Sequence, residues 1–124
     1  MNLQEQDRLA RQQIQVRLQE SQAILAELGR GGLRPDHAVS LDFRFVAPDE
    51  AKARALRAHL EANHCRDLAI APVVGEPTGR QRVSGRSHPT KLTAAIVGQW
   101  VPWMVVQGVK NGCEFEGWSA QVPN

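Results

Sequence analysis

The residues RVSGRSHPTKLTAAIVGQWVPWMVVQGVKNGCEFEGWSAQV, numbered 82–122, decide the fold of this chain. They predict a strand, a long helix that begins at Pro89, a turn at Asn111-Gly112 and a closing strand. The predicted helix is apolar on two sides, with one stripe of Ile96, Trp100, Trp103 and Val106 and a second of Val97, Val101, Met104 and Val105. A helix that is apolar all round has to be covered from two directions. We expect a sheet on one side, and either the N-terminal helix or a partner chain on the other.

Pro102 lies inside this predicted helix and removes one backbone N–H donor. A proline in a helix interior also crowds the carbonyl group one turn before it. We therefore expect a kink or a break near Gly98 and Gln99.

The first 28 residues predict a second, amphipathic helix, because good helix formers dominate them. Its apolar face is set by residues three and four positions apart, namely Ile14, Leu18, Ser21, Leu25 and Leu28. The glycines at 29, 31 and 32 predict its end. The expected organisation is an N-terminal helix over 1–29, a linker over 30–36 and a main domain over 37–124.

Residues between these two helices predict most of a sheet. Residues 37–47 alternate, with Val39, Leu41, Phe43 and Phe45 on one side, which is typical of an antiparallel strand with one solvated face. Residues 48–63 predict a helix whose buried side consists of Ala51, Ala55, Leu56 and Leu60, with Ala53 near its edge. Residues 66–74 and 80–88 predict two more strands around the turn at 75–79.

The order of elements is therefore a helix followed by β-α-β-β-α-β, which is an α+β, ferredoxin-like arrangement with an added N-terminal helix. The expected sheet order is fourth, first, third and second strand. Both helices of the domain are expected on one face.

Composition narrows the class of protein. The chain has 124 residues and a net charge of +2, which fits one domain without the strong field that would attract nucleic acid or a membrane. Cys65 and Cys113 lie far apart in the sequence and form no CxxC motif, which favours a reduced, cytoplasmic pair. Residues 1–15 do not resemble a signal peptide, and no apolar run approaches ~20 residues. We expect a soluble, cytoplasmic protein.

No catalytic or metal-binding motif is recognisable. The potential ligands show no zinc-site spacing; they are His37, His59, His64, His88, Cys65 and Cys113. Ser87 and His88 are neighbours on a predicted strand, so their side chains point to opposite faces. The sequence predicts no catalytic residues, no metal and no cofactor, and hence a protein that is not an enzyme.

Charged residues gather on the predicted open face of the sheet. They are Asp42, Arg44, Arg82, Arg86, Glu114 and Glu116, to which Trp118 adds an aromatic ring that caps the sheet edge or covers this face. Two interpretations are open. The charges form cross-strand pairs worth about a few tenths of a kcal/mol each, or they form a surface that docks a partner. Direct RNA binding is not expected, because Phe43 and Phe45 lie on the buried side and leave no stacking platform.

A second candidate surface is apolar. It joins the N-terminal helix to the tryptophans of the long helix, through Ile14, Leu18, Leu25, Trp100 and Trp103. Packing within one chain would bury these residues in the core. If the first helix does not cover the tryptophans, they form an exposed patch that needs a partner, and a homodimer is then expected.

Four phrases in the sequence follow one another in a set order. The strand over 39–45 leads into Pro48-Asp49-Glu50, then His88-Pro89-Thr90-Lys91-Leu92 follows, and the domain closes on Cys113-Glu-Phe-Glu-Gly-Trp118. Taken together, these phrases resemble the regulator of ribonuclease E activity B family. The resemblance covers roughly residues 38–118. Glu116 stands where an aspartate is commoner, and the N-terminal helix is not part of the shared core, so the resemblance is to a divergent member.

The resemblance implies a ferredoxin-like domain that binds a protein and has no catalytic residues. Members of that family with a known role bind the endonuclease ribonuclease E and lower its activity, which slows RNA turnover. The expected function is therefore protein-binding regulation by direct contact. The alternatives are a homodimeric interaction module and a domain that binds a small molecule in the cleft between helices and sheet.

Overall fold

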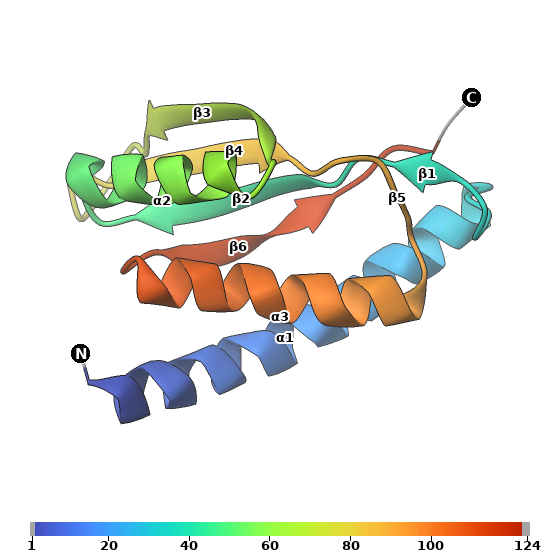
Figure 1. The fold of residues 1–124 in the computed structure, drawn as a ribbon, viewed down its shortest axis with the longest axis horizontal. Helices are drawn as coiled ribbons and strands as arrows, with labels where there is room; N and C mark the ends of the chain where they lie inside the picture. The colour runs from blue at the N-terminus through green and yellow to red at the C-terminus, as the bar shows by residue number, and fades with distance from the viewer. Residues whose placement is uncertain (1, 123–124) are drawn as a thin grey trace.

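A computed structural model describes residues 2–122 of the chain. This part contains three helices and six strands (Figure 1). In chain order they are α1 (Leu3–Arg30), β1 (Ala38–Val39), β2 (Asp42–Ala47), α2 (Glu50–Ala62), β3 (Arg66–Pro72), β4 (Gln81–Arg86), β5 (Thr90–Lys91), α3 (Ala94–Lys110) and β6 (Glu114–Ser119). The α+β class predicted from the sequence is confirmed.

The main sheet has four strands in the order β3-β4-β2-β6, and each neighbouring pair is antiparallel. This is the predicted order of the four long strand segments, although each strand is shorter than predicted. A second, two-stranded sheet joins β1 to β5 and was not predicted. No helix in the described residues is long and apolar enough to cross a membrane.

The predicted alternation on the central strand is confirmed. Phe43, Phe45 and Ala47 are buried on the helix side of β2, whereas Arg44 is exposed on the opposite side. The prediction of one unbroken strand over 37–47 is wrong. The chain leaves the main sheet at Leu41, whose N–H donates to the Ser87 hydroxyl at 2.9 Å, so β1 is free to pair with β5 instead.

Helix α2 begins where the sequence predicts, because the Asp49 carboxylate accepts the Lys52 N–H at 2.8 Å and caps the helix. Ala53, Leu56 and Leu60 are its buried residues, while Ala51 and Ala55 are exposed. The predicted inclusion of those two alanines in the buried side is therefore wrong. Spacings of three and four from Leu56 and Leu60 select Ala53, and the helix turns the other alanines outward.

Replacing Asp49 with alanine is expected to lower the free energy of unfolding by about 1 kcal/mol, because one N–H at the start of α2 loses its acceptor. Chemical denaturation followed by circular dichroism measures the change. Asp49→Asn is the matched control and should retain most of the stability, because an asparagine also caps. A loss equal to that of the alanine variant would show that charge, not capping, is what matters here.

Helix α3 begins later than predicted, at Ala94 instead of Pro89. The Thr93 hydroxyl accepts the Ile96 N–H at 3.1 Å and caps the helix, and the preceding Thr90 and Lys91 are extended in β5. Of the kink or break predicted near Gly98, the break is wrong, since the helix runs without interruption through Pro102. Its end at Asn111 and Gly112 is as predicted, with Gly112 in the left-handed region at φ +72°.

Helix α1 packs on α3 within the same chain (Figure 1). It extends through Gly29 to Arg30, further than predicted. Its buried residues are Ala10, Ser21 and Leu28. The apolar residues predicted to form an oligomer surface, Ile14, Leu18 and Leu25, lie half-buried against this chain's own core. Covering α3 from two directions therefore does not require a partner chain.

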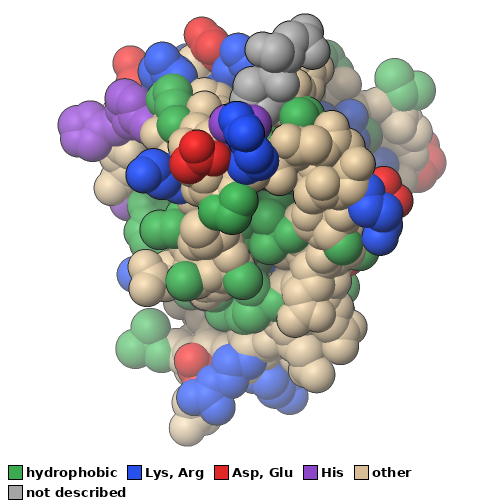
Figure 2. Space-filling model, turned by 90° about the vertical axis from the view of Figure 1, so that its right-hand side faces the viewer, with side chains coloured by type: hydrophobic (Ala, Val, Ile, Leu, Met, Phe, Trp, Pro, Cys, Tyr) green, Lys and Arg blue, Asp and Glu red, His purple; other side chains and the backbone are tan. Residues whose placement is uncertain are grey.

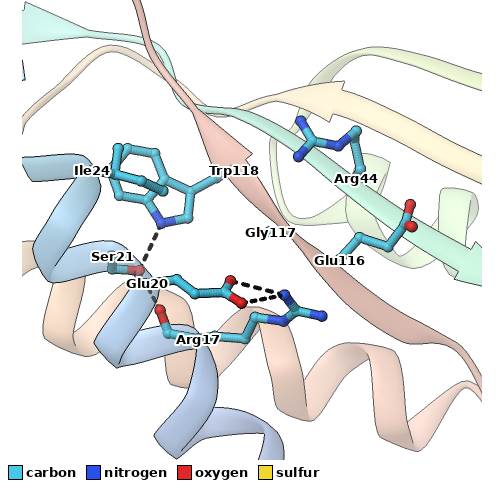
Figure 3. A pocket seen from close by; sticks show the side chains of 8 residues that line it. All are labelled: Arg17, Glu20, Ser21, Ile24, Arg44, Glu116, Gly117 and Trp118. Atoms are coloured by element: carbon cyan, nitrogen blue, oxygen red, sulfur yellow. Dashed lines mark hydrogen bonds and ion pairs between the residues drawn. The ribbon is translucent and has the colours of Figure 1, made fainter. Parts of the chain in front are cut away.

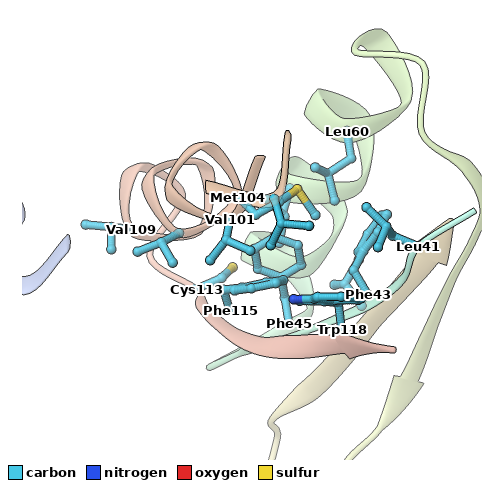
Figure 4. Packing of buried hydrophobic residues seen from close by; sticks show 14 of the residues in the cluster. Leu41, Phe43, Phe45, Leu60, Val101, Met104, Val109, Cys113, Phe115 and Trp118 are labelled. Atoms are coloured by element: carbon cyan, nitrogen blue, oxygen red, sulfur yellow. The ribbon is translucent and has the colours of Figure 1, made fainter. Parts of the chain in front are cut away.

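The hydrophobic core lies between the sheet and the helices (Figure 4). Phe43, Phe45 and Phe115 point from the strands toward the helices and are at most 1% exposed. Phe45 and Phe115 pack with ring centroids 5.2 Å apart, and Trp100 meets Phe115 edge to face at 6.1 Å. With these rings all on one side, the other side of the sheet is left to polar residues.

Candidate functional site

The open side of the sheet holds most of the predicted interaction residues. Asp42 and Arg44 come from β2, Arg82 and Arg86 from β4, and Glu116 from β6. Strand register explains the first contact, because Asp42 lies directly opposite Arg86. Their side chains pair at 2.7 Å. Arg82 reaches over β2 to pair with Glu116 at 3.0 Å.

These two ion pairs keep the Arg82 and Arg86 side chains positively charged. A hydrogen bond from Arg82 to Glu116 raises the pKa of that guanidinium, and Asp42 does the same for Arg86. Both arginines are well exposed, so the pairs contribute little to stability. Their effect is to hold the side chains flat across the sheet.

Arg44 lies on the central strand between the two ion pairs. Its side chain is exposed, and within residues 2–122 it takes part in no ion pair or side-chain hydrogen bond. Glu114 is also exposed and makes no ion pair in that part of the chain. The surface therefore combines paired charges, which are already satisfied, with one guanidinium and one carboxylate that can meet charges on another molecule.

Trp118 does not belong to this surface, which corrects the sequence prediction. It is 3% exposed and lies on the core side of the sheet. The register between β2 and β6 shifts at Arg44, which faces Gly117, while Phe45 faces Phe115. Glu116 is the extra residue of this β-bulge, and Gly117 adopts φ +129°. The bulge turns both Phe115 and Trp118 inward, although simple alternation would place them on opposite faces.

The buried indole instead joins the sheet to the N-terminal helix. Trp118 Nε1 donates to the Ser21 hydroxyl at 2.9 Å, and that hydroxyl donates in turn to the Arg17 carbonyl at 2.6 Å (Figure 3). Ser21 is the only residue in this contact that the sequence marks as unusual, since it is a polar residue on an apolar helix face. The periodicity placed it correctly but gave no indication of its partner.

A small hollow of 110 Å³ lies beside this contact, between α1 and β6 (Figure 3). Arg17 and Glu20 form an ion pair at 2.8 Å along its α1 wall, and Arg44 and Glu116 approach it from the sheet. The hollow is the size of a few water molecules, so it is too small to hold a substrate.

The tryptophans of the predicted oligomer surface lie elsewhere. Trp100 points into the core against Phe43 and Phe115, and Trp103 lies half-buried in a hollow of 250 Å³. This hollow is at the end of the molecule where α3 begins, and His64 and His88 form its rim. Figure 2 shows hydrophobic side chains gathered at this end, with histidines beside them. The hollow could not be located from the sequence, because residues 63–65 meet residues 87–103 only in the folded chain.

The described residues contain no candidate metal-binding site. The rings of His64 and His88 lie near each other, tilted by 52° with centroids 6.1 Å apart, but no group of three or more histidine, cysteine or carboxylate ligands comes together among residues 2–122. Cys65 and Cys113 are both free thiols in this region. The hydroxyl of the buried Ser87 is likewise engaged, since it accepts from the Leu41 N–H and donates to the His88 carbonyl, each at 2.9 Å.

Burial raises the pKa of the Cys113 thiol from its usual 9.0 to about 11, with a smaller opposing effect of the Lys52 charge. In the unfolded chain the thiol loses its proton at lower pH than in the folded chain. The free energy of unfolding is therefore expected to fall as the pH rises from 9.0 to about 11, by at most about 2–3 kcal/mol. Urea titrations across this range measure it. Cys113→Ala should lack this pH-dependent part, and an unchanged slope in that variant would contradict the assignment.

Comparison with known proteins gives no identification: no protein-family model matches the sequence, and no curated protein matches it.

Proposed function

We propose that this chain is a non-catalytic regulator that binds another protein directly through the open face of its four-stranded sheet. The motif resemblance indicates ribonuclease E as that partner and modulation of RNA turnover as the result. The proposal places the protein in the cytoplasm, where ribonuclease E acts on RNA. It requires no metal, cofactor or nucleic-acid contact by this chain.

The observed fold is consistent with the ferredoxin-like domain that the family resemblance implies. The element order after α1, the strand order β3-β4-β2-β6 and the antiparallel pairing all agree with a ferredoxin-like domain. Helices α2 and α3 pack against the side that carries Phe43 and Phe45, so the second side stays free for a partner. We assign the ferredoxin-like topology on this basis.

Arg44 is the single observation that carries the docking proposal. An arginine on the central strand is held by a rigid backbone, and the ion pairs on both sides leave it without a carboxylate of its own among residues 2–122. Arginines in such positions are over-represented among residues that dominate protein interfaces, because the guanidinium can pair with a carboxylate in two places at once. The expected partner surface presents carboxylates toward β2.

Arg44→Glu is expected to weaken binding of purified ribonuclease E by at least about tenfold, because it replaces attraction with repulsion at the centre of the interface. Isothermal titration calorimetry with the full chain measures the dissociation constant. The matched control is Arg54→Glu, which makes the same charge change on α2, where Arg54 is exposed and pairs with Glu50. If the full chain does not bind ribonuclease E, the partner assignment is wrong. If both variants lose affinity equally, the open face is not the docking surface.

A second candidate function is the binding of a small molecule in the 250 Å³ hollow at the start of α3. Trp100, Trp103 and Ile96 give it an apolar lining, which is typical of ligand sites. The volume of this hollow is below the range usual for such sites, about 300–1,000 Å³, so it is a weaker candidate than the docking surface.

A further inference from the structure

The two edges of the main sheet differ. At one edge, α1 lies beside β6 and receives the hydrogen bond from Trp118 to Ser21. At the other edge, β3 has no neighbouring strand beyond it within residues 2–122, and it lies at the top of Figure 1. An edge strand presents a row of N–H and C=O groups that another strand can pair with, and proteins usually protect such edges with charge or a covering element.

The middle of β3 lacks that protection. Residues 68–74 have the sequence LAIAPVV and carry no charge. The Val73 N–H donates to the Arg80 carbonyl, so the alternation of an antiparallel ladder turns the backbone groups of Ile70 away from β4. Pro72, which has no N–H, also lies at an outward position, where a proline leaves the ladder intact. Two features limit the stretch of β3 that can pair with another strand to residues 68–71. One is the irregular pairing after Arg66, and the other is Pro72.

Two charges on α2 accompany this edge. Arg57 and Glu61 line one hollow of 260 Å³ together with Cys65 and with Asp67 and Leu68 of β3, so one further carboxylate lies beside them. Neither side chain takes part in an ion pair among residues 2–122. A two-fold axis places each residue of one copy opposite the other copy's residues in reverse order. Arg57 and Glu61 lie one helical turn apart. Across such an axis, Arg57 of each copy can therefore meet Glu61 of the other.

We propose that β3 is a homodimer interface, at which a second copy of this chain pairs antiparallel through its own β3 about a two-fold axis at Ala69, so that Leu68 of each copy lies opposite Ile70 of the other. The two main sheets become continuous, and the two α2 helices lie side by side with Arg57 of each facing Glu61 of the other. The small side chains of Ala69 and Ala71 let the strands approach without steric conflict on the open face. The unpaired backbone groups of β3 can bind only an extended strand. The matched charges on α2 favour a second copy of this chain as the source of that strand.

Light scattering after size-exclusion chromatography, over concentrations from micromolar to near-millimolar, tests the proposal with the full chain. The wild-type protein is expected to shift from monomer to dimer as concentration rises. Arg57→Glu places two carboxylates opposite each other and is expected to raise the dissociation constant by at least about tenfold. The charge swap, Arg57→Glu together with Glu61→Arg, restores the complementarity and should return the constant to within about threefold of wild type.

Ala69→Lys provides a second variant that does not alter α2. It adds a charge at an exposed position near the axis and should also favour the monomer. Arg11→Glu is the control, since Arg11 is exposed on α1 far from β3 in sequence and pairs only with Asp7. A wild-type chain that stays monomeric throughout overturns the proposal. So does a dimer that neither Arg57→Glu nor Ala69→Lys weakens, because that dimer uses another surface.

This inference does not depend on the proposed function. The dimer is measured without any partner protein, and ribonuclease E binding is measured through Arg44 on a different surface. Failure of one therefore leaves the other to be judged by its own experiment.

Discussion

Replacing Trp118 with alanine is expected to lower the free energy of unfolding by about 3–5 kcal/mol, the usual effect of removing a buried aromatic side chain. The indole is 3% exposed, meets Trp100 edge to face with ring centroids 6.4 Å apart, and donates to Ser21. Its loss leaves a cavity between the sheet, α3 and α1. Urea denaturation followed by circular dichroism measures the change.

Two further variants separate the packing of Trp118 from its hydrogen bond. Trp118→Phe keeps most of the packing and removes the N–H, so it should destabilise less than alanine. Ser21→Ala leaves the indole N–H without its acceptor and should cost about 1–3 kcal/mol. If Trp118→Ala leaves stability unchanged but abolishes partner binding, then Trp118 lies on the recognition surface and the β-bulge at Glu116 is wrong.

Gly85→Ala is expected to destabilise the fold by about 1–3 kcal/mol, because an added methyl group has no room in a filled core. A Cβ atom at this position would lie 2.6 Å from Leu68 Cδ2, 2.8 Å from Phe43 Cζ and 3.1 Å from the Arg66 carbonyl oxygen. The leucine can move, but the buried ring and the neighbouring backbone cannot do so without disturbing the sheet. Thermal and chemical unfolding would both measure the loss.

The same substitution at Gly98 is the matched control. A Cβ atom there meets nothing within 4 Å, and Gly98 lies in the interior of α3, where glycine is unfavourable. Gly98→Ala should therefore stabilise the protein by about 0.5–1 kcal/mol. Equal destabilisation by both substitutions would mean that packing around Gly85 is looser than these distances require.

Much of the fold could be predicted from local pattern. The alternation through Phe43 and Phe45 gave the central strand and its buried side, and the helix periodicity of α1 placed Ser21 and Leu28 on the inner face. Asp49 marked the start of α2 through its capping chemistry. Such features depend on residues a few positions apart, so a single sequence is sufficient to show them.

The candidate site could be predicted only where alternation continued unbroken. Asp42, Arg44, Arg82 and Arg86 lie on the open face as predicted, because β2 and β4 pair in regular register. Trp118 was misplaced because an extra residue in β6 reverses the alternation after Glu116. A bulge of this kind depends on the partner strand, and nothing in β6 alone marks it apart from the adjacent Gly117.

The start of α3 was mispredicted for a related reason. Pro89 suits the first turn of a helix, but Thr90 and Lys91 are recruited into pairing with β1, and Thr93 supplies the cap that Pro89 cannot. The local preference of Pro89 for a helix start is therefore overridden by the pairing of β5 with β1, whose residues lie some fifty positions earlier. The sequence shows only the first of the two.

The amino-acid sequence by itself determined the α+β class and the identity of the charged face, because these follow from periodicity along the chain. It also determined the order of the long strands, because that order follows from the succession of helices and strands. Only the tertiary structure decided that α1 covers α3 of its own chain, that Trp118 is buried against Ser21, and that β1 leaves the main sheet to pair with β5. Each of these depends on which distant segments meet, and side-chain packing between such segments overrides local preference whenever the two disagree.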